Sequence, residues 1–187
     1  MNATENIFLV IPGLGGSGTE HWQSLWESKY ENFQRIEQTN WNYPVCSQWI
    51  ENIEKAVASN SSKNIFFVAH SLGCIAVANW AAQSKYKVVG ALLVAPPDLE
   101  IIQLQNVVVG FNPVQLRQLL FQSILVASSN DKFANISKAW QYARFWGSQF
   151  VNIGNKGHIN AESGFGDWPD GFKLLNQLVE KQFQIAI

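Results

Sequence analysis

The chain has 187 residues, which suits one domain with a sizeable core, and we expect a single domain over residues 1–187. Its formal net charge is −1 at pH 7 and it has no basic patch, which argues against a nucleic acid partner. The two cysteines, Cys46 and Cys74, form neither a disulfide framework nor a metal-binding pattern, so we expect no metal.

The apolar segments favour a core and argue against a membrane partner. Residues 65–82 contain no Asp, Glu, Lys or Arg, which is nearly the length of a membrane span. The run His70–Gly73 interrupts that segment, however, and its first half is strand-like. The N-terminus has no basic region and no long apolar core, so it does not resemble a signal peptide. With few cysteines, the chain fits a reducing, cytoplasmic location.

Apolar runs alternate with segments of helical periodicity along the chain. Strands are predicted at Ile7–Ile11, Phe33–Glu37, Ile65–Ala69, Val88–Ala95, Ser123–Ala127 and Phe150–Ile153. Helices are predicted at Thr19–Tyr30, Ser47–Ala58, Leu72–Ala82, Ile136–Trp146 and Phe172–Phe183. This alternation predicts a three-layer α/β fold, in which a six-stranded, mainly parallel sheet carries helices on both faces.

Two long connections interrupt this alternation. The segment Asp98–Leu120 is too long for an ordinary loop, and we expect it to form a small cap or a surface excursion. The segment His158–Gly171 is rich in glycine but contains aromatic residues, which predicts an ordered loop.

The segment Asn64–Ala82 has the layout of a nucleophile elbow, in which a strand, one tight turn and a helix follow one another. The motif G-x-S-x-G occurs here as the variant Ala69–Gly73, with Ser71 at its centre. Small residues flank the serine in such a turn because its backbone is strained and the strand nearly touches the helix. The N–H of Leu72 would be free at the helix start to bind an oxyanion.

Three polar residues follow predicted strands at the point where each strand ends. Ser71 follows the third strand, Asp131 the fifth and His158 the sixth. Because the carboxyl ends of parallel strands meet at one edge of a sheet, we expect these side chains to lie close together. The order Ser, Asp, His is that of the α/β-hydrolases, and each residue type has a role in activating a serine.

Other residues compete for these roles. Asp98, after the fourth strand, is the rival acid, and Asp131 could instead cap the next helix. His21, near the glycine-rich loop, is the rival base and could line the site, whereas His70 is expected to be a packing residue.

The glycine-rich loop Pro12–Gly18 has two interpretations. It matches G-x-G-x-x-G after a strand, and Glu37 lies about 20 residues further on, which is the dinucleotide-binding pattern. In a hydrolase, the same loop would supply the second oxyanion N–H, from Leu14. The extra glycines delay the helix and no Tyr-x-x-x-Lys pair is present, so the hydrolase interpretation is favoured.

The sequence resembles a known family of small enzymes over essentially its whole length. The matching runs are Val10–Gly16, Glu20–Trp22, Ala69–Gly73, Val94–Pro97, Ser129–Asp131, Trp146–Gly147 and, most specific of all, Gly154–Gly171. This resemblance is to the retinoblastoma-binding protein 9-like or YdeN-like serine hydrolases, within the α/β-hydrolase superfamily. It implies a triad of Ser71, Asp131 and His158. The sequence departs from the family at Lys132, where a proline commonly follows the acid.

Together these features predict a serine hydrolase that cleaves small carboxylic esters through an acyl-enzyme and needs no cofactor. Amides and thioesters remain open as substrates. The alternatives are an NAD(P)-dependent oxidoreductase and a non-catalytic binding protein on a hydrolase scaffold. Five aromatic residues could line an acyl pocket or could simply pack: Trp41, Tyr43, Phe111, Phe165 and Trp168.

Overall fold

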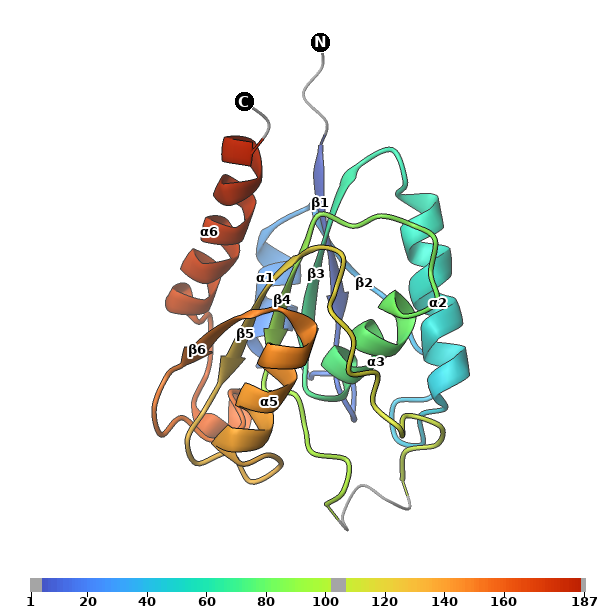
Figure 1. The fold of residues 1–187 in the computed structure, drawn as a ribbon. Helices are drawn as coiled ribbons and strands as arrows, with labels where there is room; N and C mark the ends of the chain where they lie inside the picture. The colour runs from blue at the N-terminus through green and yellow to red at the C-terminus, as the bar shows by residue number, and fades with distance from the viewer. Residues whose placement is uncertain (1–4, 102–106, 186–187) are drawn as a thin grey trace.

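A parallel sheet forms the middle of the molecule in the computed structural model, which describes residues 5–101 and 107–185 (Figure 1). Its strands are β1 (Asn6–Ile11), β2 (Phe33–Arg35), β3 (Asn64–His70), β4 (Gly90–Val94), β5 (Gln122–Ala127) and β6 (Gln149–Asn152). Their order is β2-β1-β3-β4-β5-β6, and all five strand pairs are parallel. The carboxyl ends of the strands therefore meet at one edge, as the sequence predicts.

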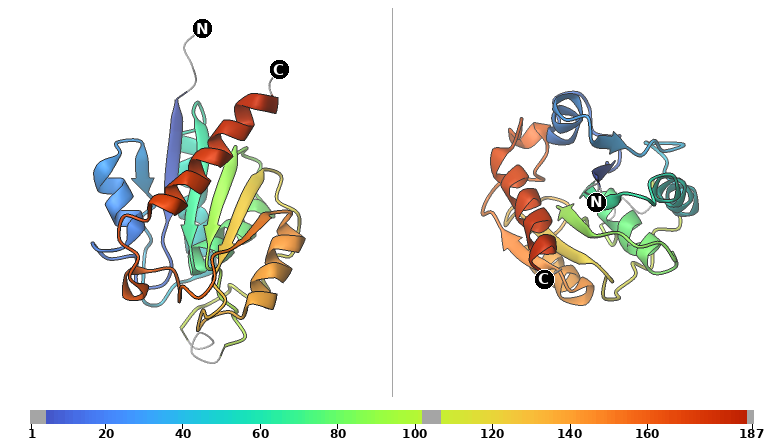
Figure 2. Two further views of the ribbon diagram at one scale, coloured as in Figure 1. Left: turned by 90° about the vertical axis from the view of Figure 1, so that its left-hand side faces the viewer. Right: turned by 90° about the horizontal axis from the view of Figure 1, so that it is seen from above.

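Helices cover both faces of this sheet. They are α1 (Trp22–Lys29), α2 (Cys46–Ser59), α3 (Leu72–Ala81), α5 (Ile136–Trp146), α6 (Pro169–Ile185) and the short 3-10 helix η1 (Ala161–Ser163). Helices α1 and α6 pack on one face, and α2, α3 and α5 pack on the other (Figures 1 and 2). The predicted three-layer α/β fold is confirmed.

The strands are buried on both faces, which explains why they appear in the sequence as continuous apolar runs. Successive side chains point to opposite faces and enter two separate cores. The face of the sheet that meets α2, α3 and α5 carries Leu9, Ile11, Phe67, Ala69 and Leu93. Toward α1 and α6 point Phe8, Val10, Phe66, Val68 and Leu92. Gly90 lets α6 approach closely, because a Cβ there would lie 3.0 Å from Leu178 Cδ2.

Two helices begin three residues away from their predicted starts. Helix α1 begins at Trp22, not Thr19, because the N–H of His21 donates to Gly18 O in a turn and the His21 side chain then caps the helix. Helix α6 begins at Pro169, not Phe172, because proline is well suited to the first helical turn, where an N–H would be unpaired anyway.

The described part of segment 98–120 runs beside α2, α3 and α5 (Figure 1), and residues 102–106 lie outside the described residues. Val109 forms an isolated bridge with Val45, and Phe111 is fully buried against Trp49. The loop at 158–171 is ordered by two indole N–H groups, which donate to the Ile159 and Asp167 carbonyl oxygens.

Helix α3 packs tightly against the end of β1 through Gly73. A Cβ on Gly73 would overlap the carbonyl oxygen of Ile11 and would lie 2.7 Å from that of Pro12. Backbone atoms cannot move aside cheaply, so this position requires glycine.

We therefore predict that Gly73→Ala lowers the free energy of unfolding by about 2 kcal/mol or more, as overpacking against a rigid neighbour does. Gly166→Ala is the matched control, because no atom lies within 4 Å of a Cβ there and its φ is not positive. Urea denaturation of both variants measures the difference, and an equal loss in the two would contradict the packing argument.

Candidate active site

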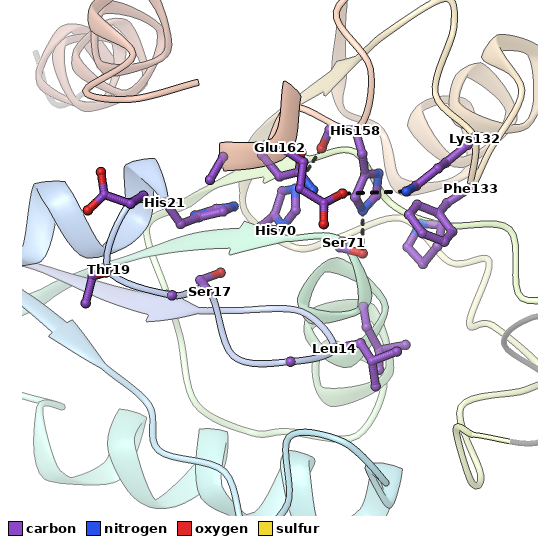
Figure 3. Close-up of a pocket in the computed structure, with 17 residues that line it drawn as sticks. Leu14, Ser17, Thr19, His21, His70, Ser71, Lys132, Phe133, His158 and Glu162 are labelled. Carbon is purple, nitrogen blue, oxygen red and sulfur yellow. Dashed lines mark hydrogen bonds and ion pairs between the residues drawn. The ribbon is translucent and has the colours of Figure 1, made fainter. Parts of the chain in front are cut away.

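Ser71 lies in the turn between β3 and α3, in a backbone conformation that side chains rarely adopt. Its φ is 52° and its ψ is −124°, as expected for the strained residue of a nucleophile elbow. The N–H of Ser71 donates to Val94 O at 2.8 Å, which ties the turn to the neighbouring strand. The Oγ faces a cavity at the carboxyl edge of the sheet (Figure 3).

The structure brings Ser71, His158 and Asp131 together in a chain of hydrogen bonds. His158 Nε2 lies 2.9 Å from Ser71 Oγ, and His158 Nδ1 lies 2.8 Å from Asp131 Oδ2. A carboxylate only accepts hydrogen bonds, so Nδ1 carries the hydrogen and Nε2 is left as an acceptor for the serine hydroxyl. The side chains of His158 and Asp131 are only 7% and 4% exposed, so little water competes for these contacts.

Short polar contacts hold the two loops that carry Asp131 and His158. Asn130 Oδ1 accepts the N–H of Gly157 at 2.7 Å, which joins the loop after β5 to the loop after β6. Asp131 Oδ1 also accepts the N–H of Phe133, which fixes the carboxylate from its own loop. The Phe133 ring meets the imidazole of His158 edge-on, with centroids 4.6 Å apart. Nothing in the sequence indicates this contact of Phe133.

The cavity beside Ser71 has a volume of about 490 Å³. The glycine-rich loop and residues 17–21 form one side, and Lys132, Phe133 and η1 form another (Figure 3). Lys132 Nζ lies 3.6 Å from Glu162 Oε2, so an exposed ion pair spans part of the rim. Lys132, the residue that departs from the family pattern, therefore borders the cavity.

The rival base, His21, lines the cavity but makes no hydrogen bond with Ser71 among the described residues. Its Nδ1 accepts the N–H of Gln23 at 3.2 Å, which caps α1 and leaves the hydrogen on Nε2. Burial, the nearby Arg35 guanidinium and His158 lower the pKa of His21 to about 4. His21 is therefore neutral at pH 7.

His70 is buried, as expected of a packing residue, but it also makes a polar contact that the sequence did not predict. Its Nε2 lies 2.9 Å from the carbonyl oxygen of His158. Burial lowers the pKa of His70 well below its ordinary value, with His158 and His21 adding to the effect.

The carboxylate of the rival acid, Asp98, is engaged with residues other than His158. Its Oδ1 is 3.4 Å from Lys138 Nζ and accepts the N–H of Glu100. Among the described residues, Asp98 makes no hydrogen bond with either ring nitrogen of His158.

None of the five aromatic residues proposed for an acyl pocket borders the cavity. Trp41 and Phe111 pack toward α2 and α3, whereas Phe165 and Trp168 pack toward α1 and α6. Tyr43 is 67% exposed on the surface. The packing interpretation therefore holds for the other four, whereas Tyr43 neither borders the cavity nor packs in the core.

The glycine-rich loop approaches the serine closely. A Cβ on Gly13 would lie 2.7 Å from Ser71 Cβ, so glycine is needed there. The N–H groups of Gly15 and Gly16 donate to Trp41 O and Gly13 O, whereas that of Leu14 has no partner among the described residues. Helix α1 begins only at Trp22, so the loop does not open directly into a helix as a dinucleotide-binding loop does.

The chain matches the protein-family model described as "Serine hydrolase" over residues 8–177. The chain belongs to the serine hydrolase family. No curated protein matches it. The family match agrees with the hydrolase interpretation of the glycine-rich loop and not with the oxidoreductase alternative.

A solved structure at 30% identity supports the same assignment, and two more distant ones share the fold. A YdeN-like hydrolase from Pectobacterium atrosepticum is 30% identical, with a TM-score of 0.84, over 95% of this chain and 92% of that one. The ydeN gene product from B. subtilis is 19% identical, with a TM-score of 0.74, over 95% and 100%. Est1E from Butyrivibrio proteoclasticus, solved with ferulic acid, is 14% identical, with a TM-score of 0.69, over 100% and 92%. This protein is a YdeN-like serine hydrolase of the α/β-hydrolase superfamily.

Two features of the described residues concern metal binding and membrane insertion. They contain no group of three or more His, Cys, Asp or Glu side chains placed to hold a metal ion. No helix in the described ranges is both long enough and apolar enough to cross a membrane.

We predict that the neutral His21 makes the fold sensitive to acid. The unfolded chain takes up a proton at this histidine below its ordinary pKa of 6.5, whereas the folded protein does so only near pH 4. The free energy of unfolding therefore falls as the pH is lowered through this range, by about 2 kcal/mol from His21 between pH 7 and pH 5.

Urea denaturation of the parent and of His21→Asn at both pH values measures this contribution. Asparagine keeps an acceptor at the N-cap of α1 but does not titrate. The variant should lose less stability on acidification than the parent, and equal losses in the two proteins would contradict the prediction.

Proposed function

We propose that this protein hydrolyses small carboxylic esters with Ser71 as nucleophile, His158 as general base and acid, and Asp131 as the residue that orients His158. The observation that carries the proposal is the hydrogen-bonded chain Ser71–His158–Asp131 at the edge of a cavity. The strained backbone of Ser71 supports it, because such strain is typical of a nucleophile elbow.

In the first half of the reaction, Ser71 Oγ attacks the ester carbonyl carbon while His158 Nε2 takes the hydroxyl proton. Asp131 stabilises the imidazolium that results and keeps the Nδ1 hydrogen in place. The tetrahedral intermediate then collapses, and the departing alkoxide takes the proton from His158, which leaves an acyl-enzyme. In the second half, water replaces the serine hydroxyl as nucleophile, the acid leaves, and Ser71 regains its proton.

Two backbone N–H groups would bind the oxyanion of each intermediate. Leu72 is the first residue of α3, and its N–H has no acceptor within the helix. The N–H of Leu14 has no hydrogen-bond partner in the described part of the chain, whereas the N–H of its neighbour Gly15 donates to Trp41 O. These observations support Leu72 and Leu14 as the donors.

The size and openness of the site favour a small substrate. A cavity of about 490 Å³ accommodates a small ester, and the described part of segment 98–120 does not enclose it. The solved structure of Est1E with ferulic acid, a small aromatic acid, comes from a protein of this fold. Small-molecule esters are therefore the first substrates to test.

We predict that a fluorophosphonate modifies Ser71 and that Ser71→Ala abolishes both this labelling and the turnover of p-nitrophenyl acetate. Mass spectrometry of the labelled peptide identifies the modified residue, and circular dichroism shows whether the variant is folded. Labelling that persists in a folded Ser71→Ala protein would refute Ser71 as the nucleophile.

We predict that Asp131→Asn lowers kcat by roughly 10⁴, as the equivalent change does in the serine-protease template, because it favours the wrong imidazole tautomer. Asp98→Asn is the matched control. Its carboxylate pairs with Lys138 and not with His158, so kcat should change by about tenfold or less. Turnover of p-nitrophenyl acetate by both variants decides between the acids, and a larger loss in Asp98→Asn would overturn the assignment.

A further inference from the structure

Two consecutive carbonyl groups in the loop that carries His158 are held by buried ring N–H groups. The carbonyl oxygen of His158 lies 2.9 Å from His70 Nε2, and that of Ile159 lies 2.9 Å from Trp22 Nε1. A carbonyl oxygen only accepts hydrogen bonds, so both ring nitrogens are donors. The loop is thus attached to β3 and to α1 at adjacent residues.

The backbone at this attachment is not in a relaxed conformation. Ile159, a β-branched residue, has a φ of 52°, and it is fully buried. A β-branched side chain at positive φ is strained, so surrounding contacts must hold it there. The two N–H donors from His70 and Trp22 are such contacts, since they bind the carbonyl groups on either side of the Ile159 φ rotation.

His70 occupies a particular place in the chain. It is the last residue of β3 and directly precedes Ser71. One rigid strand end therefore positions both the serine and the ring that donates to the carbonyl oxygen of His158. Its ring lies between the rings of His158 and His21, with centroids 4.9 and 4.7 Å away (Figure 3). This packing leaves the His70 side chain little freedom to turn away from the carbonyl group.

We propose that His70 is a positioning residue: by donating Nε2–H to the carbonyl oxygen of His158, it fixes the backbone of the general base relative to Ser71. This inference rests on the proposed function, which assigns His158 as that base. The donor is uncharged, so it holds the backbone without placing a second positive charge beside the imidazolium that forms on His158 during the reaction.

Two variants of similar size separate this role from simple packing. His70→Gln and His70→Met both remove the aromatic ring and its titration, but glutamine keeps an N–H donor at nearly the position of Nε2. With p-nitrophenyl acetate, His70→Met should lower kcat by about tenfold or more with KM within about twofold, and His70→Gln should recover most of that loss. Equal losses in the two variants, or no loss in His70→Met, would overturn the proposal.

A second experiment does not depend on ester hydrolysis. Hydrogen exchange of the backbone amides of residues 156–160 reports how firmly this loop is held. It should be faster in His70→Met than in His70→Gln and the parent, and equal rates in all three would overturn the proposal. If the parent neither turns over esters nor reacts with a fluorophosphonate, the proposed function fails, whereas the exchange rates still decide whether His70 holds the loop.

If His70→Met does not fold, the variant Trp22→Phe tests the attachment of the loop. Trp22→Phe keeps a large ring but removes the donor to Ile159 O. It should speed the exchange of the same amides, because it releases the neighbouring carbonyl group. Unchanged exchange in Trp22→Phe, together with unchanged exchange in a folded apolar variant such as His70→Leu, would refute the two-point attachment.

Discussion

The close approach of α3 to the end of β1 is the constraint on which the site depends. Gly73 lets the helix start against the carbonyl groups of Ile11 and Pro12, and Gly13 lets the next loop pass beside Ser71. Between these two contacts the backbone of Ser71 is held at a positive φ. Such strain persists only where the surroundings over-determine the conformation. The glycines therefore matter because they allow backbone to meet backbone, which in turn holds the serine at the cavity.

The ionisable side chains near this turn are arranged so that a positive charge is stabilised at one histidine. Three histidines lie in a row, and burial keeps His21 and His70 neutral at pH 7. The carboxylate of Asp131, almost completely buried, accepts hydrogen bonds from the ring of His158 and from the N–H of Phe133. A positive charge that forms on His158 therefore has a carboxylate on one side and uncharged rings on the other. This arrangement favours the imidazolium at His158 over its two neighbours, which is what the proposed proton transfer from Ser71 requires.

The sequence predicted the sheet, its helices and the meeting of three polar residues, because these follow from local patterns. Strands buried on both faces are continuous apolar runs, and parallel strands bring whatever follows them to one edge. The contact between His70 and His158 O could not be predicted, since 88 residues separate them and the shape of the loop after β6 decides it. The aromatic residues were ambiguous for a related reason: a ring such as that of Trp41 or Phe111 signals burial, but not whether it is buried in a core or in a pocket.

The glycine-rich loop shows how tertiary contacts separate two functions that share one sequence pattern. A pyrophosphate needs several free N–H groups at the start of a helix. Here the N–H of Gly15 donates to Trp41 O, and the N–H of Gly16 donates to Gly13 O within the turn. Helix α1 begins several residues later. The N–H of Leu14 has no partner in the described part of the chain, and Gly13, beside it, lies against Ser71. One free donor next to the proposed nucleophile suits a single developing oxyanion, so the same residues that match a dinucleotide-binding pattern are consistent with the proposed acyl transfer.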